Sequence, residues 1–158
     1  MQNHYREKAQ RIIEKVKYIT IATTTPNGSP WNTPVFSAFD EDYNFYWGSY
    51  RESQHSQNIK NNSEVFLVIY DSTAAPGTGE GVYVKAKAFE IENEEETDRI
   101  HTLLQKRRDP IPYWKLDQVK RNAPIRLYKA FPEKVWVNGD DKVGGNYIDV
   151  RIEVKLAP

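Results

Sequence analysis

The sequence contains no cysteine, and its acidic and basic residues are equal in number, at 22 each. Without cysteine the chain has no disulfide, no thiolate zinc site and no cysteine nucleophile. Zero net charge gives no overall field to attract nucleic acid or an anionic membrane. Apolar runs of membrane-spanning length are also missing, and the polar start of the chain is unlike a secretory signal. We therefore expect a cytoplasmic protein that binds neither nucleic acid nor a membrane.

Motifs for hydrolysis and for metal binding are missing as well. The three histidines, His4, His55 and His101, are far apart in the sequence and form no compact metal motif. There is no Gly-x-Ser-x-Gly elbow. The glycines of residues 76–79 lack the Lys-Ser/Thr ending of a phosphate-binding loop, so a plain connecting loop is expected there. We predict no metal site.

Hydrophobic periodicity predicts one β-rich domain over residues 1–158. Segments with strand patterns, separated by turn signals, are 18–25, 31–39, 45–50, 65–70, 81–92, 124–131, 133–138 and 147–154. Their hairpin succession predicts a mainly β (α+β) fold, an antiparallel split β-barrel with peripheral helices. The chain length is typical of a single domain.

Three segments away from the barrel strands have helical patterns. The first begins at Asn3, an expected N-cap, with Tyr5, Ala9, Ile12, Ile13 and Val16 on one face. The second begins at Asn93 and ends with the basic residues 106–108, which complement the helix dipole and need no nucleic-acid partner. A short helix is expected at 113–121 and a glycine-rich turn at 139–145.

Residues 45–59 are the most informative segment for function. A strand pattern ends near Ser49, and Ser53 is the expected N-cap of a small helix with Gln54, His55 and Ser56 in its first turn. Free backbone N–H groups and the positive end of the helix dipole would suit a phosphate there. An ordinary connecting helix explains the same residues equally well.

A proline lies inside the preceding strand pattern. Pro34 removes one donor from the hydrogen-bond ladder, so residues 31–39 are expected at a sheet edge or beside a ligand.

Taken in order, these segments resemble the pyridoxamine 5'-phosphate oxidase-like family of FMN-binding split barrels. The resemblance covers nearly the whole chain and rests on an initial helix followed by Ile19-Thr-Ile-Ala-Thr-Thr, Pro26-Asn-Gly-Ser-Pro, Thr33-Pro-Val-Phe, Phe45-Tyr-Trp-Gly-Ser, Ser53-Gln-His, Asn58-Ile and Phe131-Pro-Glu-Lys-Val-Trp.

The resemblance implies a homodimer with FMN between two barrels. The flavin ring would lie against residues 33–36 and the phosphate beside 47–49 and 53–55, with Trp136 approaching across the dimer. The implied cofactor-binding residues are Pro34, Val35, Phe36, Trp47, Ser49, Ser53, Gln54, His55, Asn58 and Trp136.

The chain also departs from the family. Where the oxidases have Ser-Arg-Lys for the phosphate, this chain has Ser53-Gln54-His55, which replaces two permanent cations by an amide and a titratable ring. Their substrate-binding Arg-x-His pair has no counterpart between residues 138 and 158. We therefore expect less electrostatic phosphate binding, and an activity other than vitamin B6 oxidation.

Three functions from different classes follow. The first is a flavin-dependent oxidoreductase acting on an unknown small molecule, in which the cofactor supplies the redox chemistry. The second is a non-catalytic flavin-binding or sensing protein. The third, an oligonucleotide-binding barrel with aromatic stacking platforms, is disfavoured by the zero net charge. Deazaflavin or haem in place of FMN is a variant of the first.

Overall fold

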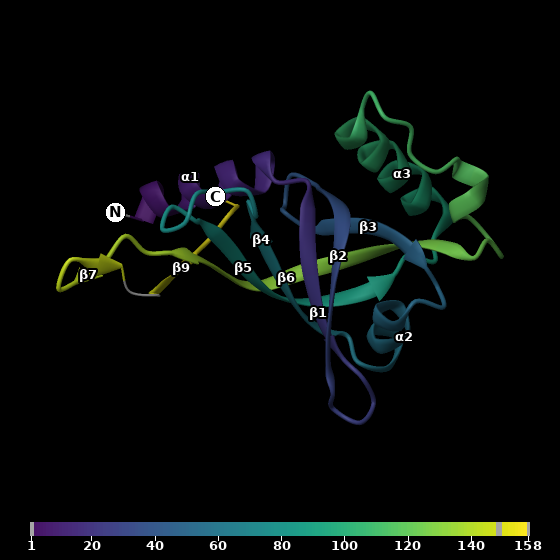
Figure 1. Ribbon diagram of the computed structural model, residues 1–158. Helices are drawn as coiled ribbons and strands as arrows, with labels where there is room; N and C mark the ends of the chain where they lie inside the picture. The colour runs from purple at the N-terminus through teal and green to yellow at the C-terminus, as the bar shows by residue number, and fades with distance from the viewer. Residues whose placement is uncertain (1, 148–149, 158) are drawn as a thin grey trace.

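The computed structural model describes residues 2–147 and 150–157, which form a β-barrel with peripheral helices (Figure 1). The helices are α1 (Gln2–Lys15), α2 (Gln54–Asn61) and α3 (Glu94–Arg108), with a 3₁₀ turn η1 (Leu116–Val119). The strands are β1 (Tyr18–Thr24), β2 (Pro30–Phe39), β3 (Phe45–Tyr50), β4 (Glu64–Tyr70), β5 (Gly81–Glu90), β6 (Ile125–Asn138), β7 (Lys142–Val143), β8 (Asn146–Tyr147) and β9 (Arg151–Val154).

Six strands form the barrel in the order β3, β2, β1, β4, β5, β6, and each adjacent pair is antiparallel. A pairing between β3 and β6 closes the ring, with Phe45 opposite Ala130 and Tyr50 opposite Ile125. The predicted fold, an antiparallel split barrel of the mainly β (α+β) class with peripheral helices, is confirmed.

The barrel splits along one edge of β6, where that strand changes partners. Residues 125–130 pair with β3 and residues 135–138 pair with β9. Between them, residues 131–134 have β5 as their neighbour on the opposite edge. A single long strand therefore belongs both to the closed barrel and to the extension that carries β9.

The predicted division of this region into strands 124–131 and 133–138 is wrong, because the chain runs through Pro132 as one strand. Pro132 lies where β6 lacks a neighbour on the split edge, so its missing N–H removes no ladder bond there. The register with β5 shifts between Lys85, which lies opposite Lys134, and Ala86, which lies opposite Pro132, so that Glu133 is the extra residue of β6. This bulge absorbs the proline without ending the strand.

Alternation along the strands fills the barrel interior with branched apolar side chains. Ile19 and Ile21 of β1 and Leu67 and Ile69 of β4 are almost completely buried. Helix α1 adds its apolar face, Ala9, Ile12 and Ile13, to the same core. In the part of the chain that the structure describes, no helix combines the length and the apolar character needed to cross a membrane.

Helix α3 packs outside the barrel over a second apolar cluster. Ile100 and Leu104 of α3 pack there with Tyr46 and Leu127 of the barrel wall. Arg107 lies in the basic segment at the end of α3, and its Nη2 donates to the carbonyls of Ile13 (2.7 Å) and Val16 (3.0 Å) at the end of α1. Arg107 thus joins the end of α3 to the end of α1.

Other boundaries differ from the prediction. Helix α1 already includes Asn3, the expected N-cap, and the helix expected at 113–121 is only the four-residue turn η1. Two backbone groups at the start of this segment bond to side chains and not to helical partners. The carbonyl of Trp114 accepts from His101 Nε2 (2.5 Å), and the Lys115 N–H donates to Gln118 Oε1 (2.8 Å). The strand expected at 147–154 is divided between β8 and β9, and its residues 148–149 lie outside the described residues.

Candidate functional site

The end of β3 and the start of α2 bring three predicted site residues together. His55 Nε2 lies 2.7 Å from Ser49 Oγ and 3.3 Å from Ser53 Oγ, and the two serine oxygens are 3.3 Å apart. Residues 51–53 are the whole connection between the two elements, which is why the end of the strand faces the start of the helix. We call Ser49, Ser53 and His55 the hydroxyl–imidazole cluster.

The first turn of α2 has backbone donors beside this cluster. The helical ladder begins with the bond from the Gln57 N–H to the Ser53 carbonyl (3.0 Å), so the N–H groups of residues 54–56 precede it. Ser53 is the N-cap, as predicted, but its hydroxyl donates to the Tyr50 carbonyl (2.8 Å) and caps no N–H group. Uncapped N–H groups and the helix dipole together favour an anion at this position.

His55 is enclosed by the protein, with only 6% of its surface exposed. Burial lowers the pKa of His55 from the usual value for histidine, because a charged imidazolium is poorly solvated there. At neutral pH the free cluster is therefore uncharged. An anion bound beside it would favour the charged ring and raise the pKa of His55.

Two further predicted residues hold α2 in place. Gln54 is exposed, and its Nε2 donates to Asn58 Oδ1 (2.8 Å). Asn58 is completely buried, and its Nδ2 donates to Thr23 Oγ1 of β1 (2.9 Å). Asn58 therefore connects α2 to the barrel, and the first turn of the helix is positioned through it.

The three predicted residues on β2 face different environments. Pro34 is exposed opposite Thr20 of β1, while residues 37–39 of the same strand pair with β3. Residues 30–36 thus have a sheet neighbour on one side in the described chain, which confirms the predicted edge. Val35 points into the barrel core. Phe36 is half-buried, and its ring lies 5.9 Å from that of Tyr18.

The two predicted tryptophans lie apart from one another. Trp47 is completely buried in the barrel core, where its ring stacks on Tyr128 at 5.9 Å, so its indole is not exposed to a ligand at the surface. Its Nε1 has no hydrogen-bond partner among the described residues. Trp136 is half-buried on the outer face of β6, where it stacks on Phe66 at 6.2 Å.

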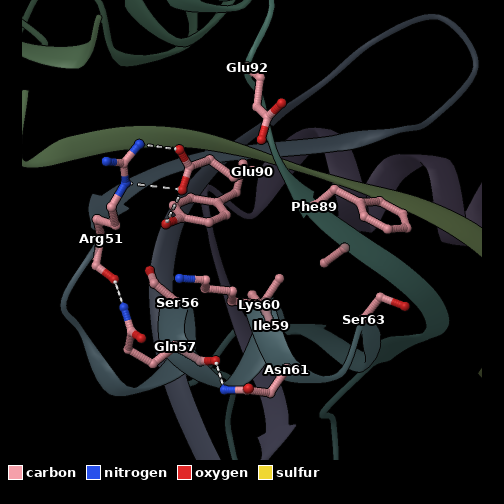
Figure 2. A pocket seen from close by; sticks show the side chains of 12 residues that line it. Arg51, Ser56, Gln57, Ile59, Lys60, Asn61, Ser63, Phe89, Glu90 and Glu92 are labelled. Carbon is pink, nitrogen blue, oxygen red and sulfur yellow. Dashed lines mark hydrogen bonds and ion pairs between the residues drawn. The ribbon is translucent and has the colours of Figure 1, made fainter. Parts of the chain in front are cut away.

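A hollow of about 610 Å³ on the other side of α2 was missed by the sequence analysis (Figure 2). Ser56 lines it, and its Oγ lies 2.9 Å from Ser53 Oγ of the cluster. Glu90 also lines it and pairs with Arg51 at 2.7 Å. The contact between Ser53 and Ser56 could have been predicted from their spacing at the start of one helix. The pair of Arg51 and Glu90 joins residues 39 positions apart and has no local signal in the sequence.

Comparison with known proteins decides the family. A family model described as pyridoxamine 5'-phosphate oxidase matches residues 5–139. The chain belongs to this family. The resemblance noted in the sequence is thereby confirmed over α1 to β6. The pyridoxamine 5'-phosphate oxidase match ends at residue 139, at the start of the region in which the Arg-x-His pair is missing.

Solved structures show the same fold at low sequence identity. A provisionally assigned pyridoxamine 5'-phosphate oxidase from Listeria innocua is 17% identical, with 84% of this chain and 96% of that chain covered and a TM-score of 0.64. HutZ, the heme storage protein of Vibrio cholerae, is 17% identical, with 81% and 90% covered and a TM-score of 0.69. A heme-binding protein from Mycobacterium smegmatis is 14% identical, with 95% and 57% covered and a TM-score of 0.72. No curated protein sequence matches the chain.

Proposed function

We propose that this family member binds FMN, with the phosphate at the first turn of α2. The observation that carries the proposal is the hydroxyl–imidazole cluster beside uncapped N–H groups of a helix. The N–H groups of residues 54–56, together with the hydroxyls of Ser49 and Ser53, supply the donors that a phosphate requires. His55 adds a group that can become charged when the dianion binds.

The flavin ring would lie along the exposed edge of β2. Pro34 offers no N–H there, and Phe36 presents a half-buried ring on the same side of the strand. Val35 and Trp47 point into the core, so a ligand would meet only their backbone atoms. Their side chains pack in the barrel core and thereby hold the backbone of β2 and β3 in position.

FMN, when bound, supplies the ability to accept or donate a hydride. The chain's own residues then hold the phosphate, orient the ring and exclude water from one face of it. The cluster contains no carboxylate, and its one titratable ring is turned to the two serines. We therefore propose a flavin-dependent oxidoreductase whose substrate is a small molecule still to be identified, with the chemistry supplied by the cofactor.

Haem is the alternative raised by two of the structural relatives. Haem iron needs an axial ligand such as histidine. His55 is buried against Ser49, and His101 Nε2 bonds to the Trp114 carbonyl. His4 is exposed but pairs with Asp140 at 3.4 Å. Each of these contacts uses only one ring nitrogen, so the preference for FMN rests on the phosphate donors at the first turn of α2 and not on the histidines.

Nucleic acid is disfavoured on the strand surface of the barrel, where the lysines are paired. Lys85 and Lys87 on β5 lie 3.5–3.8 Å from the carboxylates of Glu64 and Glu133, and the partly buried Lys129 pairs with Glu96 at 2.9 Å. Phosphate binding along a strand of nucleic acid depends on unpaired cations.

The test is a titration of the purified protein with FMN, followed by flavin fluorescence. We expect saturation at one FMN per chain and quenching of the fluorescence. Absence of binding at micromolar FMN would overturn the proposal. If FMN binds, reduction of the complex by NADH or NADPH, measured anaerobically at 450 nm, separates an oxidoreductase from a non-catalytic flavin carrier.

A further inference from the structure

A cavity of about 330 Å³ lies where α1 packs against β9, at the end of the molecule that carries both termini (Figure 1). Its volume is at the lower end of the range of about 300–1,000 Å³ common for ligand pockets. Gln10 Nε2 of α1 donates to the Leu156 carbonyl (3.0 Å) and holds the two elements together. We call this space the α1–β9 cavity; it is lined by Tyr5, Arg6, Ile152, Glu153, Val154 and Lys155.

The cavity runs along the open edge of β9. This strand pairs with β6 on one edge, and no strand among the described residues pairs with the other. Four consecutive residues, 152–155, line the cavity, although successive side chains of a strand point to opposite faces. The Gly139 N–H donates to the Val150 carbonyl (2.7 Å), and hydrogen-bonded pairs alternate along antiparallel strands. The Glu153 N–H therefore points away from β6, to the open edge.

Arg6 is a charged donor without an acceptor on the chain. Its side chain is half-buried, and Nε is enclosed without a hydrogen-bond partner. Within the described chain the guanidinium also has no ion pair. By contrast, Arg11 of the same helix donates through Nη2 to both carboxylate oxygens of Glu80 (3.1 and 2.9 Å). A partly desolvated guanidinium without a partner is stabilised by an anion more than an exposed one is.

The other charges of the lining favour a ligand with one negative charge. Glu153 lies 3.7 Å from Lys134, which is outside the cavity. Lys155 is exposed and has no ion pair with any described residue. Arg6, Glu153 and Lys155 together sum to +1, so a monoanion makes the lining neutral. A second negative charge would be repelled by Glu153.

The rest of the lining is apolar. Tyr5 and Ile152 are partly buried and pack against the same core as Val154. A tyrosine ring offers a flat apolar surface against which a planar group can pack. The cavity thus joins an unpaired guanidinium to an apolar wall.

From these features we infer that the α1–β9 cavity binds a small organic acid through its carboxylate. The carboxylate accepts hydrogen bonds from Arg6, whose planar fork matches its two oxygens. The Glu153 N–H and the Lys155 ammonium group supply further positive potential on the same lining. The apolar part of the acid packs on Tyr5 and Ile152. The cavity shares no residue with the hydroxyl–imidazole cluster, so the inference does not depend on FMN binding.

Three ligands of similar shape test the preference for a carboxylate. Benzoate carries one negative charge, benzamide is its neutral analogue, and phenyl phosphate is a dianion at pH 8. Isothermal titration calorimetry of the full chain at that pH should show benzoate binding about 3- to 10-fold more tightly than benzamide, the range expected for one partly exposed charge pair. Phenyl phosphate should bind more weakly than benzoate.

Variants of two arginines on α1 assign the contact. Arg6→Met keeps the length of the side chain and removes its charge, so it should weaken benzoate to the level of benzamide and leave benzamide unchanged. Arg6→Lys keeps the charge without the fork and should lie between Arg6→Met and the parent. Arg11→Met removes an arginine that is already paired and lies outside the cavity, so it should alter neither affinity.

Any of four results overturns the inference. Benzoate does not bind at millimolar concentration, or benzamide binds as tightly as benzoate, or phenyl phosphate binds more tightly than benzoate, or Arg6→Met binds benzoate as Arg11→Met does. The first three are measured on the parent protein and do not require any variant to fold. Circular dichroism spectra of the variants should match the parent's, because Arg6 makes no hydrogen bond or ion pair in the described chain.

Discussion

At the scale of single residues, His55 links the fold to the proposed function. The sequence resemblance matches His55 to a lysine of the oxidases, and the structure adds that this ring is buried and bonded to Ser49. Burial could not be read from the local sequence, because a first-turn residue of a connecting helix is usually solvated. It depends on the end of β3 packing over the helix, which only the folded barrel provides.

The pH dependence of FMN binding tests this role. The pKa of His55 is lowered by burial in the free protein and should rise when the phosphate dianion binds, so the complex holds more protons. FMN affinity should therefore increase as pH falls from about 8 to about 6, the range in which the phosphate is still largely a dianion. His55→Ala should weaken binding by about 10-fold or more at pH 6, the size of one charge-assisted hydrogen bond. Fluorescence titrations at a series of pH values measure it.

His55→Lys is the matched variant, because a lysine stays charged throughout this range. It should restore affinity and flatten the pH profile. If His55→Ala binds FMN as tightly as the parent at about pH 6, the phosphate lies elsewhere and α2 is only a connection.

At the scale of elements, the barrel strands were predictable and the docking of α2 was not. Residues 45–50 form β3 as predicted, because alternation and β-branched or aromatic residues encode a strand locally. The bond from Asn58 to Thr23 joins residues 35 positions apart and has no local signature. The prediction of a strand break at Pro132 was wrong for the same reason. Whether a proline interrupts a strand depends on whether the strand has a neighbour on that edge, and the local sequence does not show this.

Removing the Asn58 side chain should measure the docking of α2. Asn58→Ala leaves Thr23 Oγ1 without its donor in the buried barrel wall. We expect a loss of about 1–3 kcal/mol in the free energy of unfolding, the usual cost of an unsatisfied buried polar group. Asn61→Ala removes a bond from an exposed side chain of the same helix and should cost less than about 0.5 kcal/mol. Urea denaturation compares the two, and equal losses would contradict the assigned role of Asn58.

A glycine tests how the segment after α3 packs against the barrel. A methyl group at Gly48 of β3 would overlap the side chains of Tyr113 and Trp114. Gly48→Ala should therefore destabilise the protein by about 1–3 kcal/mol, the typical cost of overpacking. Gly79→Ala adds the same methyl group where nothing lies within 4 Å and should be nearly neutral. Thermal unfolding of both variants gives the comparison. An unchanged melting temperature for Gly48→Ala would show that Tyr113 and Trp114 can move to make room for the methyl group, which would contradict tight packing there.

At the scale of the whole molecule, aromatic side chains gather on the outer face of the sheet formed by β1, β4, β5 and β6. Val68, Tyr83 and Trp136 follow one another across β4, β5 and β6 in register. On the same outer side Tyr18 is 62% exposed and Tyr70 is 47% exposed. These side chains are neighbours and form one patch, unlike single exposed apolar residues scattered over a surface. The homodimer implied by the sequence resemblance would cover this patch.

We therefore propose that the protein is a homodimer through this face. Light scattering should report a dimer at micromolar concentration. Tyr18→Asp should raise the dimer dissociation constant about 10-fold or more, because a charge would be desolvated in the interface. Ile111→Asp, at an equally exposed apolar residue outside the face, should leave it unchanged. A monomer in the parent protein would remove the proposed contribution of Trp136 across the dimer.

If the first turn of α2 holds the phosphate of FMN, the protein should distinguish FMN from riboflavin. The two ligands share the flavin ring and differ in the phosphate. We expect the parent protein to bind FMN about 10-fold or more tightly than riboflavin at pH 6, since several hydrogen bonds to a dianion are involved. His55→Ala should reduce that ratio by weakening FMN and leaving riboflavin unchanged. Equal dissociation constants for FMN and riboflavin in the parent protein would contradict the claim.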